Sequence, residues 1–62
     1  MKVHYDAAAD VLVIRLSGKR ADGGEEIGDG VAVLTTSRGE IVEIEIRRAA
    51  ARVPRLILAG AA

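Results

Sequence analysis

The chain of 62 residues contains no cysteine, tryptophan or phenylalanine, and Tyr5 is its only aromatic residue. Without cysteine, neither a disulfide nor a thiolate metal site is available, and we expect a cytoplasmic protein. Without further aromatic residues, the chain lacks the stacking surfaces that bind single-stranded nucleic acid. No run of about 18 apolar residues is present, and no charged segment precedes an apolar core at the N-terminus. We therefore expect neither a membrane span nor a signal peptide.

Net charge is absent as well, because nine basic residues balance nine acidic residues. Binding to nucleic acid through its phosphates needs a net basic surface, so this balance argues against a nucleic-acid partner. The charges are nevertheless segregated. Residues 22–45 contain seven acids and one base, whereas residues 47–55 contain four arginines and no acid.

Branched aliphatic residues are plentiful, since the chain has 18 valines, isoleucines and leucines. Its length leaves room for a single domain, residues 1–62, and a domain of this size is marginally stable. Small scaffolds are usually strengthened by disulfides, metals or oligomerisation. Because cysteine is missing, we expect a homo-oligomer, most simply a two-fold dimer.

Alternation of apolar and polar residues predicts four strands. The clearest strand covers residues 40–47, whose aliphatics at 42, 44 and 46 fall on one face and whose Glu43, Glu45 and Arg47 fall on the other. The other strands are predicted at residues 2–5, 11–16 and 31–36, and residues 25–27 form at most a short extended piece. The expected main core consists of Leu12, Ile14, Leu16, Val42, Ile44 and Ile46.

Turn residues separate these strands. Asp6 is expected to cap a tight connection between the first two strands with its carboxylate. Residues 17–24 read SGKRADGG and form a loop. Asp29-Gly30 marks a turn or bulge, and the turn at residues 37–39 places Gly39 in the left-handed region.

The C-terminal segment is ambiguous. Residues 48–53 have a helical composition, and Pro54 ends or kinks that helix. Residues 55–59 are then either a strand or a further apolar turn. The predicted fold is mainly β, of the α+β class: a four-stranded antiparallel meander with a short helical C-terminal segment.

Several short motifs follow one another in a distinctive order. They are Tyr5-Asp6, Ala9-Asp10, Asp29-Gly30, Gly39 and the Ile44-Glu45-Ile46 triplet. Together they resemble the small, uncharacterised bacterial family named domain of unknown function 2283, over roughly residues 2–52. Leu34 and two threonines stand where this resemblance implies acidic or aromatic residues. The family has no established activity, and the resemblance implies at most an antitoxin-like or partner-binding role.

His4, Asp6 and Asp10 are the nearest group to a metal or acid–base site. A divalent metal needs at least three convergent ligands, commonly imidazole with carboxylates. His4 and Asp6 share a strand face and the hairpin brings Asp10 close, so a small metal-dependent enzyme is one hypothesis. We favour the alternative that both aspartates bond to the backbone of the turn and that no metal or other cofactor is bound.

Other catalytic patterns find little support. Ser17 and Ser37 lie in glycine-containing loops, and no second histidine is available as a base. Glu43 and Glu45 share a strand face, but a solvated sheet face has the same pattern. Gly18-Lys19 precedes a loop rather than a helix, so it does not match a phosphate-binding loop. We expect that the protein is not an enzyme.

Arg48, Arg52 and Arg55 recur at helical spacing and are candidates for binding a protein partner. The glutamates of residues 40–45 lie one strand away and are the alternative partners of these arginines. The strands at 11–16 and 31–36 carry aliphatic residues on both faces, so one face needs a further cover, either residues 56–58 of the same chain or a second copy. The expected oligomer interface consists of Val11, Val13, Leu34, Leu56, Ile57 and Leu58.

The function most consistent with this sequence is that of a small, non-enzymatic protein-interaction module that associates with itself. The first alternative is an antitoxin-like or regulatory partner protein that uses its arginine-rich C-terminal segment. The second is the metal-dependent enzyme built on His4, Asp6 and Asp10. No residue pattern identifies a ligand, a substrate or a partner.

Overall fold

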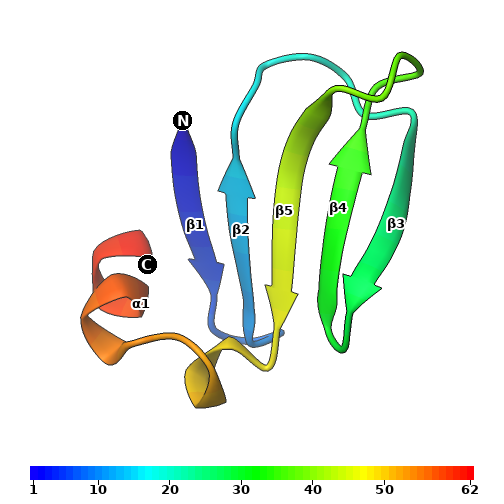
Figure 1. The fold of residues 1–62 in the computed structure, drawn as a ribbon. Helices are drawn as coiled ribbons and strands as arrows, with labels where there is room; N and C mark the ends of the chain where they lie inside the picture. Colours follow the sequence, from blue (N-terminus) through cyan, green and yellow to red (C-terminus); the bar gives the residue numbers. More distant parts are fainter.

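The computed structural model describes residues 1–62, and it contains one antiparallel sheet followed by two short helical segments (Figure 1). The strands are β1 (Lys2–Asp6), β2 (Val11–Arg15), β3 (Gly23–Gly28), β4 (Val31–Thr35) and β5 (Ile41–Arg47). The 3-10 turn η1 (Ala49–Ala51) and the helix α1 (Arg55–Ala61) follow them. The mainly β class with a short C-terminal helix is confirmed. The expected number of four strands is wrong, because the sheet has five.

The strand that the sequence did not reveal is β3. Its sequence, GGEEIG, contains one aliphatic residue, Ile27, so no alternation marks it. It pairs with β4 through backbone groups that any residue supplies, and a bulge interrupts the pairing between Glu26 and Gly28. All six residues of β3 are exposed. Glycine and glutamate tolerate this exposure well in an edge strand.

The strand order also differs from the expected meander. The order across the sheet is β1-β2-β5-β4-β3. Residues 16–22 pass from β2 to the far edge, where β3 begins, and β5 then returns to lie between β2 and β4 (Figure 1). This arrangement places the three strands richest in aliphatic residues at the centre. The more polar β1 and β3 form the edges, where fewer side chains are covered.

The register gives the sheet an apolar and a polar face. Across β2 and β5, Leu12 lies opposite Ile46 and Ile14 opposite Ile44, and Val33 of β4 continues the second row. The apolar face carries Val3, Tyr5, Leu12, Ile14, Val31, Val33, Ile41, Ile44 and Ile46, with Glu25 and Thr35 among them. Ile27, at the bulge of β3, lines the same hollow as Val33 and Ile41. The polar face consists of Lys2, His4, Asp6, Val11, Val13, Arg15, Glu26, Ala32, Leu34, Glu43, Glu45 and Arg47.

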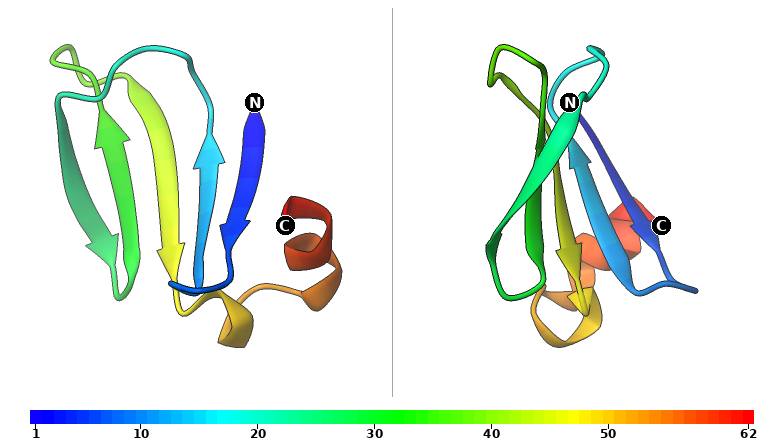
Figure 2. Two further views of the ribbon diagram at one scale, coloured as in Figure 1. Left: turned by 180° about the vertical axis from the view of Figure 1, so that it is seen from behind. Right: turned by 90° about the vertical axis from the view of Figure 1, so that its right-hand side faces the viewer.

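The apolar face is covered on one side only. Leu58 and Ala61 of α1 pack with Ala49 of η1 against Leu12, and Tyr5 adjoins this cluster. Both the front and the back view place α1 beside β1, at the opposite end of the sheet from β3 (Figures 1 and 2). We call the covered region the helix side and the region of β3 and β4 the hairpin side.

The expected core is therefore confirmed in register for Leu12, Ile14, Ile44 and Ile46, whereas Val42 stands at a bulge and pairs with no residue of β4. Leu12 is 2% exposed and Val42, at a bulge in β5, is fully buried. The carbonyl oxygen of Val42 accepts hydrogen bonds from the N–H groups of Leu16 and Ser17. Leu16, however, is 43% exposed, and Ile14 is only half-buried.

The C-terminal segment forms its helix later than expected. Residues 49–51 make only one 3-10 turn, because Arg48 has a left-handed backbone with φ of 54° and Pro54 cannot continue a helix. Pro54 instead stands at the N-cap position of α1. The helix covers Arg55–Ala61, which resolves the choice left open for residues 55–59. With seven residues, α1 is too short to cross a membrane, and no other helix is long enough.

The predicted turns at Asp6, Gly30 and Gly39 are confirmed, whereas the predicted loop at residues 17–24 ends earlier than expected, because Gly23 and Gly24 already pair with β4. Oδ1 of Asp6 accepts hydrogen bonds from the N–H groups of Ala8 and Ala9, which closes the β1–β2 connection. Gly30 and Gly39 both have positive φ, 76° and 84°, in the turns before β4 and β5.

Candidate functional site

The structure does not bring the three residues of the proposed metal site together as ligands of one ion. His4 lies on the polar face opposite Val13. The carboxylate of Asp6 is occupied by the turn that it caps, and that of Asp10 is occupied by other partners described next. No three histidine, aspartate or glutamate side chains gather in a geometry that would hold a metal ion.

Asp10 joins three parts of the chain at the base of β1 and β2. The Tyr5 hydroxyl donates a hydrogen bond to Oδ1 of Asp10 at 2.7 Å. The same oxygen accepts from the N–H of Ala50 at 2.9 Å, and the Asp10 carbonyl accepts from the N–H of Ala49 at 3.1 Å. Asp10 makes these bonds from a left-handed backbone, φ 56°, which aspartate tolerates better than most residues. The contacts hold η1 against the β1–β2 turn.

These contacts shift two pKa values in opposite directions. The hydrogen bond from the Tyr5 hydroxyl, followed by that from the Ala50 N–H, lowers the pKa of Asp10. The hydrogen bond to Asp10, with smaller contributions from desolvation and from the charge of Asp10, raises the pKa of Tyr5. At neutral pH the carboxylate therefore accepts and the phenol donates, which is the arrangement of a structural tie.

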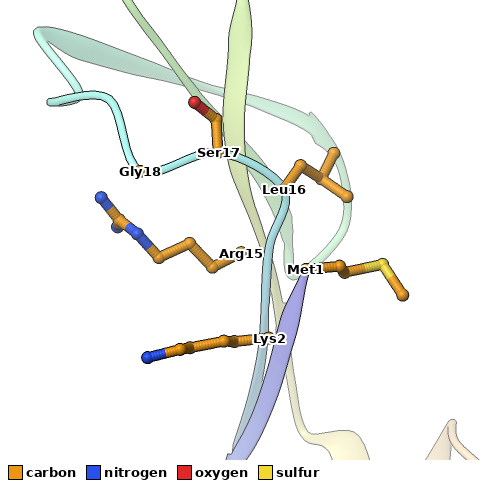
Figure 3. A pocket seen from close by; sticks show the side chains of 6 residues that line it. All are labelled: Met1, Lys2, Arg15, Leu16, Ser17 and Gly18. Atoms are coloured by element: carbon orange, nitrogen blue, oxygen red, sulfur yellow. The ribbon is translucent and has the colours of Figure 1, made fainter.

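A small hollow of about 240 Å³ lies where β1 and β2 meet the connection to β3. Lys2 and Arg15 project to one side of the strands, and Met1 and Leu16 to the other (Figure 3). The Arg15 guanidinium is already engaged, by Glu43 at 3.1 Å and by the Lys19 carbonyl at 3.0 Å. This hollow therefore contains the guanidinium of Arg15, which is already paired, and the exposed side chain of Met1.

The remaining catalytic candidates have local structural partners. Oγ of Ser17 accepts a hydrogen bond from the N–H of Lys19, and the N–H of Ser37 donates to the Asp22 carboxylate. Glu43 pairs with Arg15, so the two glutamates of this face are not equivalent. No serine contacts a histidine or a carboxylate through its hydroxyl.

Two of the three predicted partner-binding arginines converge. A Cβ atom on Gly30 would lie 2.7 Å from Nη1 of Arg52 and 3.3 Å from Nη2 of Arg48. Arg48 pairs with Asp29 at 2.8 Å, instead of with the glutamates of residues 40–45, and this pair lowers the pKa of Asp29. We call Arg48 and Arg52, with Gly30 beneath them, the basic corner.

No hydrogen bond or ion pair joins Arg55 to the basic corner. It is the first residue of α1, exposed, and Pro54 and the end of η1 separate it from Arg52. The helical stripe that the spacing suggested is not formed, because η1 is a single turn. The sequence indicated these arginines and the Asp29-Gly30 turn, but not that Arg48 and Arg52 lie against that turn.

The residues of the expected oligomer interface lie in three environments. Val11, Val13 and Leu34 are half-buried on the polar face, where charged side chains flank them. Leu58 is 7% exposed and belongs to the core of its own chain. Leu56 and Ile57, by contrast, are 88% and 50% exposed on the outer surface of α1.

The larger uncovered aliphatic surface lies on the hairpin side of the apolar face. An open hollow of about 490 Å³ is lined there by Ile27, Val33 and Ile41. Glu25, Gly24 and Thr35 complete its lining. Ile27 is 66% exposed and Ile41 is 48% exposed. The sequence did not indicate this surface, because Ile27 lies in β3, whose residues show no alternation of apolar and polar side chains.

Comparison with known proteins supports the resemblance seen in the sequence. A family model described as "Protein of unknown function (DUF2283)" matches residues 2–49. This range spans the whole sheet and ends at the first residue of η1, before α1 begins. No curated protein and no solved structure matches the chain.

Proposed function

We propose that this chain, which belongs to the family described as "Protein of unknown function (DUF2283)", is a non-enzymatic interaction module that self-associates through the apolar face of its sheet. The observation that supports this proposal most directly is the uncovered hairpin side of that face. Only six of 62 residues are buried, and Leu16, Ile27 and Ile41 are between 43% and 66% exposed.

A second copy of the chain is the occupant that best suits this face. Domains of this length bury little surface and are marginally stable, so a further apolar cover contributes a large share of the total stability. If the sheets of two copies faced each other, the hairpin side of each copy would be covered by the other copy. The polar faces would remain outside, as in a β-sandwich. Because each copy offers the same surface, a two-fold dimer closes without further growth.

Edge-to-edge pairing of sheets is disfavoured by the sequence of β3. This edge strand contains two glutamates and a bulge between Glu26 and Gly28. Charges and bulges at an edge oppose the addition of another strand. The other edge, β1, has α1 beside it (Figures 1 and 2). Association through the apolar face remains the arrangement that covers the most aliphatic surface.

Sedimentation equilibrium from low micromolar to millimolar concentration tests this proposal. We expect a species of about 13 kDa, twice the 6.5 kDa of one chain. Ile27→Glu should weaken the dimer at least about tenfold without unfolding the chain, because Ile27 is already exposed. Ser37→Glu adds the same charge at an exposed turn and is the matched control. A mass of one chain at every concentration would contradict the proposal.

A second candidate function is recognition of an acidic segment of another protein, in an antitoxin-like or regulatory role. It is favoured by the basic corner, because Arg52 reaches only the Arg47 carbonyl, at 3.4 Å, and pairs with no carboxylate. Arg52→Gln should abolish the shifts that a glutamate-rich peptide causes in the Gly30 amide resonance. Arg38→Gln, at an exposed turn, should leave those shifts unchanged. Equal shifts in both variants would rule this candidate out.

A further inference from the structure

We infer that the two copies pack reciprocally, with Leu56 and Ile57 of α1 in each copy filling the hairpin-side hollow of the other. This inference rests on the proposed self-association and adds the contact that determines its geometry. It brings together two surfaces that lie at opposite ends of one sheet and that a single chain does not join.

The protruding element is an anchored apolar corner of α1. Leu56 is 88% exposed and Ile57 is 50% exposed, although both are large aliphatic residues. The helix that presents them is held in place, because Leu58 and Ala61 of the same helix are buried against Leu12. Two exposed aliphatics on a helix that is already ordered lose little conformational freedom on binding.

The receiving element is the hollow between β3, β4 and the start of β5. Its volume of about 490 Å³ falls within the range of roughly 300–1,000 Å³ typical of sites that accept ligand-sized groups. Ile27, Val33 and Ile41 give it an apolar floor. A pair of aliphatic side chains is therefore a suitable occupant in both size and chemistry.

Charge complements this apolar contact. Arg55 directly precedes Leu56, is exposed and makes no ion pair. Glu25 lines the hollow beside Ile27, is exposed and makes no ion pair either. The neighbouring Glu26, in contrast, points to the polar face and pairs with Arg47. Opposite unpaired charges thus border the protrusion and the hollow.

The positions of the two elements permit both contacts at once. α1 lies beside β1 (Figures 1 and 2) and packs on the apolar face of the sheet. The hollow lies on the same face and is lined by residues of β3, β4 and β5. When two sheets face each other across a two-fold axis parallel to their strands, β1 of one copy lies over β3 of the other. Each copy then contributes one helix and one hollow, and the assembly closes as a dimer.

Charge reversal tests the reciprocal contact. The dissociation constant of the dimer is measured by sedimentation equilibrium for the unmodified chain, Glu25→Arg, Arg55→Glu and the double variant. Both residues are exposed, so folding should survive each change, and circular dichroism verifies this. We expect each single reversal to weaken the dimer at least about tenfold, and the double variant to return to within a few-fold of the original.

A second measurement does not depend on the mutants. In a mixture of isotope-labelled and unlabelled chains, nuclear Overhauser contacts between copies should join the methyl groups of Leu56 or Ile57 to those of Ile27 or Ile41. A dimer that shows neither these contacts nor the rescue would overturn the reciprocal packing while leaving self-association intact. A monomer at all concentrations would overturn the self-association itself, so the two failures are distinguishable.

Discussion

The helix side and the hairpin side of this sheet have similar strands but different surroundings. On the helix side, Leu12 is 2% exposed because α1 and η1 cover it. On the hairpin side, Ile27 is 66% exposed on the same face. The number of aliphatic residues therefore does not decide where the core forms. On this face, the position of η1 and α1 decides it.

The family match sharpens this contrast. The matched residues 2–49 contain all five strands but exclude α1, so the matched part of the chain leaves almost the whole apolar face without a cover. In this chain α1 covers one side of that face, and Asp10 ties the segment leading to α1 to the sheet. A second copy would supply for the hairpin side what α1 supplies for the helix side.

The largest predicted effect comes from alanine substitutions on the two sides. Leu12→Ala removes a fully buried side chain and should lower the free energy of unfolding by about 3 kcal/mol or more, enough to unfold so small a domain. Ile41→Ala changes a residue that is 48% exposed, so in dilute solution it should lower the free energy of unfolding by about 1 kcal/mol. Thermal and urea unfolding followed by circular dichroism measure both.

Protein concentration provides the control for this comparison. If a second copy covers Ile41, the loss caused by Ile41→Ala should grow as the protein is concentrated, since the dimer then buries the residue. The loss caused by Leu12→Ala should not depend on concentration in this way, because α1 of the same chain covers Leu12. Equal losses at both sites in dilute solution would show that the hairpin side is covered after all.

Part of the fold was predictable because local chemistry determines it. The alternation of β5 and the aliphatic run of β2 gave both strands and their shared face, and Gly30 and Gly39 marked turns that need positive φ. β3 was not predictable in this way, because glycine and glutamate give no periodic signal. The strand order was missed because the path of residues 16–22 depends on which strands pair.

The candidate site was predictable only as a set of residue types. The sequence identified Arg48 and Arg52 as basic residues near the C-terminus. Their convergence depends on the left-handed backbone of Arg48 and on the β3–β4 turn reaching the end of β5, where the Arg47 N–H donates to the Gly30 carbonyl. Both are tertiary features, and periodicity does not report them.

A smaller effect tests the basic corner, which links the C-terminal segment to the hairpin side. Gly30→Ala should cost about 1–2 kcal/mol for the positive φ, plus the displacement of Arg48 and Arg52 from the new Cβ atom. Gly39→Ala is the matched control, because its φ is also positive but its Cβ atom would meet open space. Thermal unfolding should therefore show the larger loss for Gly30→Ala. Equal losses would mean that the two arginines move aside freely.

The smallest predicted effect is a loss of stability in acid, to which one carboxylate from each side contributes. The pKa of Asp10 is lowered by the Tyr5 hydroxyl and that of Asp29 by Arg48, so each is lower in the folded than in the unfolded chain. Each contribution to stability is therefore present above the ordinary aspartate value of about 3.9 and is lost as the pH falls through the lowered pKa. Unfolding by urea, measured from neutral pH down to strongly acidic pH, should show this decline.

The two carboxylates should differ in how much of that decline they cause. The Asp29 side chain is 86% exposed, so solvent and salt screen its pairing with Arg48. Asp10 is half-buried and holds two hydrogen bonds from Tyr5 and Ala50. Asp10→Asn should therefore flatten the acid decline more than Asp29→Asn, and added salt should reduce only the contribution of Asp29. A larger effect of Asp29→Asn at high salt would mean that the hairpin side, and not the Asp10 tie, controls stability in acid.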